Sequence, residues 1–385
     1  MVKSIPPSIN THTSNKKPTL LVMAGGTGGH IFPGLAVAEK LKSEGWNIHW
    51  LGTADRMEAD IVPAHGFEIS FITISGLRNK NIMAWLKLPF KLINSLMQAL
   101  SVIRKIKPDA VLGMGGYASA PGGLAAWLMN KPLVVHEQNA AAGLTNRLLA
   151  RIATKVCCAF PNAFKNSVSA QVVGNPLRAS IGEHTIQDNH HEEAAKTSHN
   201  VLVIGGSLGA QILNQIVPKS FAKLIKINST NNDALPFNIW HQTGKGKQQS
   251  VIDEYNQQHL VDEQVTVTEF IDDIANAYQW ADVVICRAGA LTVSELAMAA
   301  KPAIFVPLPH AVDDHQTKNA QYLVSRGGAV LINQRDLTCE VLAKQLSELF
   351  SEPQILKQMV QSAFAAADAD ATNKVADICQ QLAAA

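Results

Sequence analysis

The two halves of the chain open in the same way, and this duplication most constrains how the chain can fold. The stretches TLLVMAGGTGGHIFPGLAVAEKL (19–41) and NVLVIGGSLGAQILNQIV (200–217) each pass from an apolar segment through a glycine-rich turn into helical periodicity. Further apolar runs then alternate with helical stretches. Continuous apolar strands between helices are typical of parallel sheets covered on both faces. We therefore predict an α/β protein with two Rossmann-like, doubly wound domains. The expected strands after the openings are 47–51, 110–112, 133–136, 238–241, 265–268, 283–286 and 303–306.

The GNPLR segment (174–178) marks the expected boundary between the two domains, because a polar, His-rich and acid-rich stretch follows it. We expect a disordered tail at 1–17, a first domain at 18–176 and a second domain at 177–364. The Ala-rich helical stretch 365–385 is expected to pack back on the first domain. Residues 1–17 contain no apolar segment of the kind found in secretory signals.

Charge and cysteine content exclude several classes of protein. The chain has 33 basic and 31 acidic residues, a net charge of +2, which excludes a strongly basic nucleic-acid binder. Five cysteines without a CxxC pattern argue against a disulfide scaffold or zinc site and favour a reducing compartment. The longest uncharged run, 110–130, holds five glycines and Pro121, so a strand, a loop and a helix start explain it better than a membrane span.

Three glycine-rich turns follow predicted strands: GGTGGH (25–30), GMGGYASAPGG (113–123) and GGSLGA (205–210). Helix N-termini carry unpaired N–H groups and bind anions, and glycine lets a phosphate approach the backbone. Tight structural turns are the alternative explanation. The GxGxxG dinucleotide pattern fails at Ile31 and at Leu208, and the strand that ends Leu51-Gly52-Thr53 lacks at its end the acid that would hold a ribose. We therefore expect the amides of both bends to hold a nucleotide diphosphate between the domains.

Seven separated motifs resemble the MurG family of bacterial glycosyltransferases over roughly residues 18–380. They are GGTGGHIFPGLAVA, GMGGYASAPG, HEQNAAAGLTNR, GNPLR, GGSLGA, RAGALTVSEL and DDHQTKNA, in the family's order. The resemblance implies a GT-B fold with a deep cleft between the domains. It also implies an inverting transfer of GlcNAc from UDP-GlcNAc to the 4-hydroxyl of MurNAc in lipid I, which gives lipid II for peptidoglycan, cell shape and division. No metal or cofactor is implied.

The resemblance also implies a set of residues that bind UDP-GlcNAc. The first glycine loop lies near the donor sugar and acceptor, and helix residues near 290–295 surround the nucleoside, with Glu295 on the ribose. Asn139 and Gln316 contact the sugar, Arg178 and Ser207 the diphosphate, and the Ile271 backbone the uracil. The implied binding residues are Thr27, Gly28, Gly29, Asn139, Arg178, Ser207, Ile271, Ala290, Leu291, Thr292, Val293, Ser294, Glu295 and Gln316.

His30 and Glu137 are the candidate catalytic residues. His30 stands at a predicted helix start, where the helix dipole disfavours imidazolium, so a neutral ring could take the acceptor's proton. The alternatives for His30 are capping of the turn or binding of a phosphate oxygen. Glu137 could orient His30 or a substrate hydroxyl, or it could merely satisfy backbone groups.

Two acidic motifs have competing interpretations. Thr292-Val-Ser-Glu295 has the T-x-x-E pattern of a helix capping box, which would occupy the Glu295 carboxylate, whereas the resemblance places it on the ribose. Asp368-Ala-Asp370 matches the DxD metal-diphosphate pattern, but its Ala-rich helical context favours a solvated helix start. No metal site is predicted.

A basic segment predicts where the protein works. Residues 69–108 contain seven basic residues and no acid, and Leu77–Leu96 mixes cations with large apolar side chains. Long cations meet anionic headgroups while aromatic residues enter the membrane interface. We assign Leu92, Leu96, Leu100 and Ile103 to the core. The residues expected at the membrane are Arg78, Lys80, Ile82, Trp85, Leu86, Lys87 and Phe90.

These features predict a peripheral enzyme on the cytoplasmic face of the bacterial inner membrane. Its expected partners are UDP-GlcNAc, lipid I, the anionic membrane surface, and proteins of cell-wall synthesis and division, with no nucleic acid. The alternatives are another two-domain UDP-sugar enzyme such as a UDP-GlcNAc epimerase, a nicotinamide-dependent oxidoreductase, and a non-catalytic nucleotide sensor.

Overall fold

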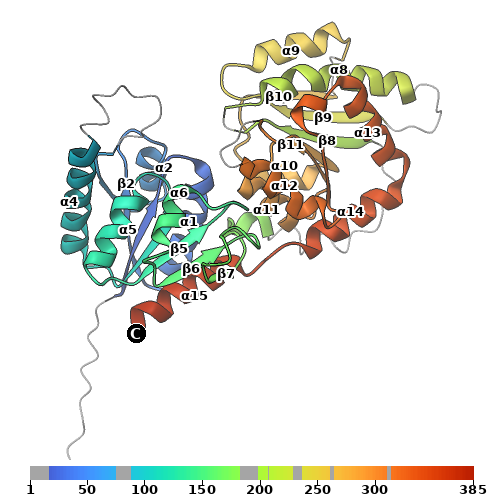
Figure 1. Cartoon of the computed structure of the whole chain (residues 1–385). Coiled ribbons are helices and arrows are strands. Elements are labelled where there is room, and N and C mark those ends of the chain that lie inside the picture. Colours follow the sequence, from blue (N-terminus) through green and yellow to red (C-terminus); the bar gives the residue numbers. More distant parts are fainter. Residues whose placement is uncertain are drawn as a thin grey trace, which may run out of the picture.

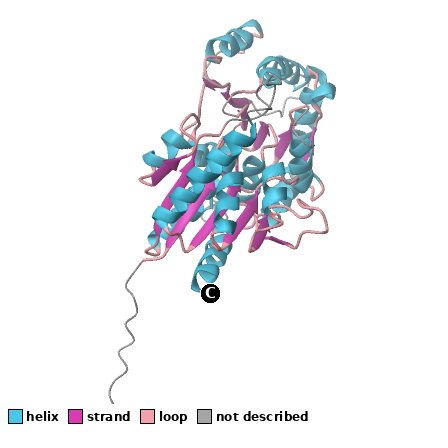
Figure 2. Ribbon diagram, turned by 60° about the vertical axis from the view of Figure 1, so that its left-hand side comes forward, coloured by secondary structure: helices cyan, strands magenta, loops and turns pink. Residues whose placement is uncertain are grey.

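The computed structural model describes residues 17–74, 88–182, 198–206, 208–228, 236–260, 264–309 and 314–385. They form two lobes, each built around one parallel sheet with helices on both faces (Figures 1 and 2). The α/β prediction of two doubly wound domains is therefore confirmed. Ser207 and six of the expected membrane residues (Arg78, Lys80, Ile82, Trp85, Leu86 and Lys87) lie outside the described residues.

The first lobe holds a seven-stranded sheet in the order β3-β2-β1-β4-β5-β6-β7. Its central strands β1 and β4 are fully buried, which is why they read as continuous apolar runs. The strands are β1 (Thr19–Ala24), β2 (Asn47–Gly52), β3 (Glu68–Phe71), β4 (Ala110–Gly115), β5 (Leu133–Glu137), β6 (Lys155–Cys158) and β7 (Ala170–Val172). The helices are α1 (Gly28–Ser43), α2 (Glu58–Ala64), α4 (Leu88–Ile106), α5 (Ser119–Leu128) and α6 (Leu144–Leu149).

The second lobe holds a six-stranded sheet in the order β10-β9-β8-β11-β12-β13. The strands are β8 (His199–Ile204), β9 (Phe237–Gln242), β10 (Val265–Thr268), β11 (Val283–Cys286), β12 (Ala303–Phe305) and β13 (Ala329–Leu331). The helices are α8 (Gln211–Asn228), α9 (Gln248–Gln257), α10 (Ile274–Trp280), α11 (Ala290–Met298), α12 (His315–Val324), the 3-10 turn η3 (Gln334–Asp336), α13 (Cys339–Ser351) and α14 (Pro353–Ala365).

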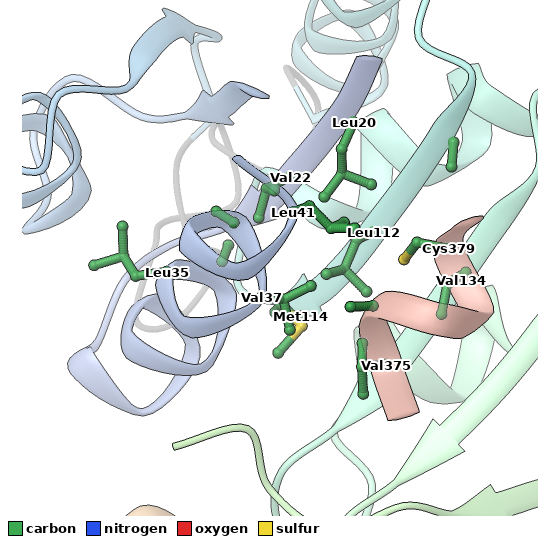
Figure 3. Close-up of a cluster of buried hydrophobic side chains, with 14 of the residues drawn as sticks. Leu20, Val22, Leu35, Val37, Leu41, Leu112, Met114, Val134, Val375 and Cys379 are labelled. Carbon is green, nitrogen blue, oxygen red and sulfur yellow. The ribbon is translucent and has the colours of Figure 1, made fainter. Parts of the chain in front are cut away.

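The last helix, α15 (Ala371–Ala384), leaves the second lobe and packs on the first. Val375 and Cys379 of α15 are fully buried in one cluster with Leu112 and Met114 of β4 and with residues of α1 (Figure 3). The aspartates of the DxD pattern precede this helix. Asp368 pairs with Lys374 at 2.7 Å, and Asp370 stands at the N-cap of α15.

Helix α4 corrects one expectation about the core. Its buried stripe runs through Ser95, Ala99 and Ile103, each fully inaccessible. Leu92 lies off this stripe near the helix start and is 47% exposed, so its assignment to the core was wrong. Leu96 and Leu100 are partly buried against the core.

Strand order fixes where a ligand can bind. In each sheet the order reverses beside the first strand of the lobe, between β1 and β4 and between β8 and β11. Helices that leave adjacent strands toward opposite faces open a crevice at such a point, beyond the carboxyl ends of the strands. The glycine turns after β1, β4 and β8 and the start of α11 after β11 all lie at these two points.

Candidate functional site

The first glycine loop is held from inside the protein by a buried carboxylate that the sequence analysis missed. Glu58, only 1% exposed, accepts a hydrogen bond from the Gly26 N–H at 2.9 Å through Oε2. Its Oε1 accepts from the N–H and hydroxyl of Thr53 at 3.0 and 2.7 Å. A side chain at Gly25 would overlap this carboxylate, so glycine is required there. Thr27, Gly28 and Gly29 follow and begin α1 with partly exposed surfaces.

His30 lies in the first turn of α1, where the loops after β1 and β4 meet. Its Nδ1 is 3.2 Å from the Gly25 carbonyl, and a Cβ at Gly115 would lie 3.1 Å from its Nε2. Burial, the largest influence, lowers the pKa of His30 below its ordinary value. Glu137, the Gly25 carbonyl and Glu58 oppose that shift, and His315 of the second lobe adds to it. The ring is therefore neutral near pH 7, as the sequence analysis expected, although burial is the main cause.

Glu137 anchors the loop that follows β5. It is 2% exposed, and it accepts hydrogen bonds from the backbone and side chain of Asn139 at 2.9 and 3.2 Å. It also accepts from the Gly143 N–H at 3.1 Å and the Asn146 amide at 2.9 Å. Of the alternatives that the sequence left open, these bonds match the one in which Glu137 accepts hydrogen bonds from groups of the loop. Its charge reaches His30 only through space.

Two buried asparagines that the sequence analysis did not single out join the lobes. Asn319 of α12 accepts from the Ala140 N–H at 2.7 Å and donates to the Asn139 side chain at 3.2 Å. Asn175 donates to the Gln138 carbonyl of the first lobe at 3.2 Å and to the Ser294 hydroxyl of the second at 3.0 Å. Both lie inside quoted motifs, DDHQTKNA and GNPLR, which was the only signal for them.

Arg178 and Glu295 meet at the junction of the lobes. The Arg178 guanidinium lies 3.6 Å from Glu295 and over the Phe32 ring at 4.9 Å. Tyr278, which the sequence did not indicate, donates its hydroxyl proton to Glu295 at 2.9 Å. Burial raises the pKa of Glu295, while Arg178 and Tyr278 act in the opposite direction. Arg178 Nε and Asn175 Oδ1 are buried without a hydrogen-bond partner in the described part of the chain.

The capping-box interpretation of Thr292-Val-Ser-Glu295 is wrong. Helix α11 begins at Ala290 with Gly289 as its N-cap, so Thr292 already lies inside the first turn. The Glu295 carboxylate is therefore one turn too far along to reach back to the cap, and it faces Arg178 and Tyr278 instead.

The second glycine loop is also partly occupied by the protein itself. Gln242 Oε1 accepts from the N–H groups of Gly205 and Gly206, each at 3.1 Å. Together with the Glu58 bond to Gly26, this contradicts, for these three amides, the expectation that the amides of both bends hold a diphosphate. Further along the second loop, the Gly209 N–H is also taken, by the Gly206 carbonyl at 2.8 Å.

The other expected binding residues lie around the second lobe's switch point. Ile271 follows β10 and is 8% exposed. Ala290 and Val293 of α11 are buried, whereas Leu291, Thr292 and Ser294 are partly exposed. Gln316, in the first turn of α12, accepts from the Leu308 N–H at 2.9 Å, which occupies its side-chain oxygen. No three His, Cys, Asp or Glu side chains cluster as a metal site would need, within the residues that the structure describes.

Family models match both lobes. The glycosyltransferase family 28 N-terminal domain matches residues 20–158, and the family 28 C-terminal domain matches residues 200–382. A relative from Colwellia psychrerythraea is 62% identical over 97% of this chain and 96% of its own length. The chain belongs to the MurG family.

That relative is named UDP-N-acetylglucosamine-N-acetylmuramyl-(pentapeptide) pyrophosphoryl-undecaprenol N-acetylglucosamine transferase. The crystal structure of Acinetobacter baumannii MurG superposes with a TM-score of 0.77 at 39% identity, covering 94% of this chain and 99% of that one. A UDP-N-acetylglucosamine 2-epimerase structure from Listeria monocytogenes gives 0.64 at 16% identity, over 94% and 95% of the chains. The last likeness shows a shared fold alone. The MurG-family resemblance and the GT-B fold predicted from the motifs are thus confirmed.

Replacing Glu295 with Gln tests the cost of its buried charge. Folding raises the pKa of Glu295, so the folded protein binds the carboxyl proton of Glu295 more tightly than the unfolded chain does. The contribution of Glu295 to the free energy of unfolding therefore falls as pH rises above 4.5. Glu295→Gln should therefore gain free energy of unfolding relative to wild type as pH rises above 4.5 in urea titrations. The exposed Glu348→Gln should show no such trend. A Glu295→Gln variant that loses stability as pH rises would contradict the assignment.

Proposed function

We propose that this chain transfers GlcNAc from UDP-GlcNAc to the 4-hydroxyl of MurNAc in lipid I, with inversion, to give lipid II for peptidoglycan synthesis. The observation that carries the proposal is the 62% identity, over nearly the full chain, to a transferase named for this reaction. The match covers 97% of this chain and therefore spans both lobes.

Donor binding is assigned to the second lobe and the junction. Glu295 lies in the second turn of α11 with its carboxylate toward Arg178, so a ribose could take its free lone pairs while the guanidinium meets the diphosphate. The unpartnered Arg178 Nε is a donor available to such an anion. Ser207, Asn139, Gln316 and the Ile271 backbone complete the assignment by family resemblance.

His30 is assigned as the general base. Inverting displacement needs a base that removes the proton of the 4-hydroxyl as that oxygen attacks the anomeric carbon and the UDP oxygen departs with the bonding electrons. The neutral ring can accept this proton at Nε2, since Nδ1 faces the Gly25 carbonyl. Glu137 would stabilise the imidazolium through space, while its hydrogen bonds hold the Asn139 loop.

Membrane docking is assigned to the start of α4 and its neighbour α5. On α4, Phe90 is 75% exposed, and Ile93 and Met97 are exposed by more than half. Helix α5 packs against α4 and exposes Trp127 and Leu128. Lys91 is also exposed. Among the described residues, no helix combines the length and apolarity that crossing a bilayer demands. We propose that this face, on the cytoplasmic side of the inner membrane, gives access to an acceptor held by its polyprenyl chain.

A product assay tests the reaction itself. The protein is incubated with UDP-GlcNAc and a lipid I analogue, and the products are separated by mass spectrometry. We expect equal amounts of UDP and of the disaccharide lipid. Conversion of UDP-GlcNAc to its C2 epimer without transfer would instead indicate an epimerase, and an absence of any product would reject the proposal.

His30→Ala should lower the turnover number about 100-fold or more, because a general base contributes on that order. The dissociation constant for UDP, measured by calorimetry, should stay within about twofold, since the ring does not belong to the assigned donor contacts. His259→Asn serves as the control: His259 is exposed with φ of 56°, a conformation that Asn tolerates. Unchanged turnover in His30→Ala would remove the base assignment.

Phe90→Glu should weaken binding to anionic phospholipid vesicles. Burial of an apolar side chain of this size contributes about 1.5–3 kcal/mol, so the partition coefficient should fall roughly 10- to 100-fold. Turnover on a short-chain soluble acceptor should not change. Val341→Glu, which alters an exposed apolar residue on α13 of the other lobe, is the matched control for vesicle sedimentation. Equal sedimentation of Phe90→Glu and wild type would place the membrane face elsewhere.

A further inference from the structure

Glu58 is a buried carboxylate with an unusual set of partners. It stands in the first turn of α2 and is bound by three neutral donors, the Gly26 N–H and the N–H and hydroxyl of Thr53. A Cβ at Gly52 would lie 2.7 Å from Glu58 Cγ, and one at Gly25 would overlap the carboxylate itself. Two glycines therefore make room for this one side chain beside the first loop. Burying a charged group raises the free energy of the folded state unless hydrogen bonds compensate. An acid that served only to make the protein soluble would therefore be more stable on the surface.

A single peptide group connects Glu58 to His30. The N–H of the Gly25–Gly26 peptide donates to Glu58 Oε2 at 2.9 Å, and the C=O of that same peptide lies 3.2 Å from His30 Nδ1. A carbonyl oxygen can only accept, so a hydrogen bond here puts the proton on Nδ1. The Thr27 hydroxyl oxygen, 3.5 Å from the same nitrogen, is the longer contact and can accept as well. The other ring nitrogen, Nε2, then carries the lone pair and lies beside Gly115, where the absence of a side chain leaves space.

We propose that Glu58 is a positioning residue that acts on His30 through the Gly25–Gly26 peptide, fixing the Nδ1–H tautomer and leaving Nε2 free for the acceptor's proton. The inference rests on the proposed role of His30 as general base. Hydrogen bonds in a chain polarise one another, so the carboxylate strengthens the carbonyl as an acceptor for Nδ1–H. The tautomer of a histidine is set by the bond that its other nitrogen makes.

No proton moves through this chain of bonds. The acceptor's proton ends on Nε2 as the new glycosidic bond forms and UDP leaves. The imidazolium formed in that step faces Glu58 of α2 and Glu137 of β5, which favour its charge, and His315 of α12, which opposes it. Of these three groups, Glu58 also accepts a hydrogen bond from the Gly25–Gly26 peptide, which orients the His30 ring.

The first test needs no variant. The ¹⁵N chemical shifts of His30 in the wild-type protein, assigned by comparison with His30→Gln, report which ring nitrogen carries the proton. We expect the Nδ1–H tautomer at neutral pH. An Nε2–H tautomer would overturn the proposal whether or not any variant of Glu58 folds.

The second test removes the charge. Glu58→Gln keeps the size of the side chain but loses the carboxylate, so the pKa of His30 followed by NMR should fall and the Nδ1–H tautomer should become less populated. Asp60→Asn removes an exposed acid from the same helix turn and should change neither quantity. Equal His30 pKa and tautomer in Glu58→Gln and wild type would overturn the proposal.

A double-mutant cycle separates positioning from general structural damage. Glu58→Gln should lower the turnover number roughly tenfold or more in the wild-type background and leave it within about twofold in the His30→Ala background. An equal loss in both backgrounds would show that Glu58 does not act through His30. Because the NMR measurements need no substrate, they still decide the Glu58–His30 link if the product assay rejects the proposed reaction.

Discussion

The arrangement of the site depends on hydrogen bonds that two buried asparagine side chains make between the lobes. Asn319 is fully inaccessible and Asn175 is 3% exposed, and each bonds to the loop after β5 as well as to α11 or the strand end beside it. Leaving a buried amide donor without its partner costs about 1–3 kcal/mol, so the hydrogen bonds of each asparagine stabilise this relative arrangement of the lobes. That arrangement brings Arg178 onto Phe32 and His315 within electrostatic reach of His30.

Buried carboxylate and amide side chains hold the loops in place by hydrogen bonds to their backbone N–H groups. Glu58 closes the first loop, Glu137 the loop after β5, and Gln242 the second glycine loop. Glu58 and Gln242 act on backbone N–H groups of the glycine bends that were expected to hold a diphosphate. The protein thus uses its own polar side chains where the strands end.

The strands at the centre of each sheet could be predicted because burial on both faces leaves an apolar run, as in β4 and β11. Strands β3, β6, β7 and β13 were missed: each has only three or four residues and none is buried throughout, so none forms a long apolar run. Strand β10 is equally short and partly exposed but was predicted. Glu58 could not be found, since a buried acid and an ordinary acid in a first helical turn look alike in sequence. The motif match located Arg178 and Glu295, but only the helix start showed that Glu295 is not a cap.

The packing of α15 has a consequence for how the chain is made. Val375, Ala376 and Cys379 complete the interior between α1 and β4, yet they are synthesised only after the whole second lobe. Domains usually acquire their structure in the order of translation. Here part of the apolar core of the first lobe stays uncovered until the ribosome has synthesised residues some 260 positions beyond Leu112. A chaperone that shields nascent chains would find its target on that unfinished face.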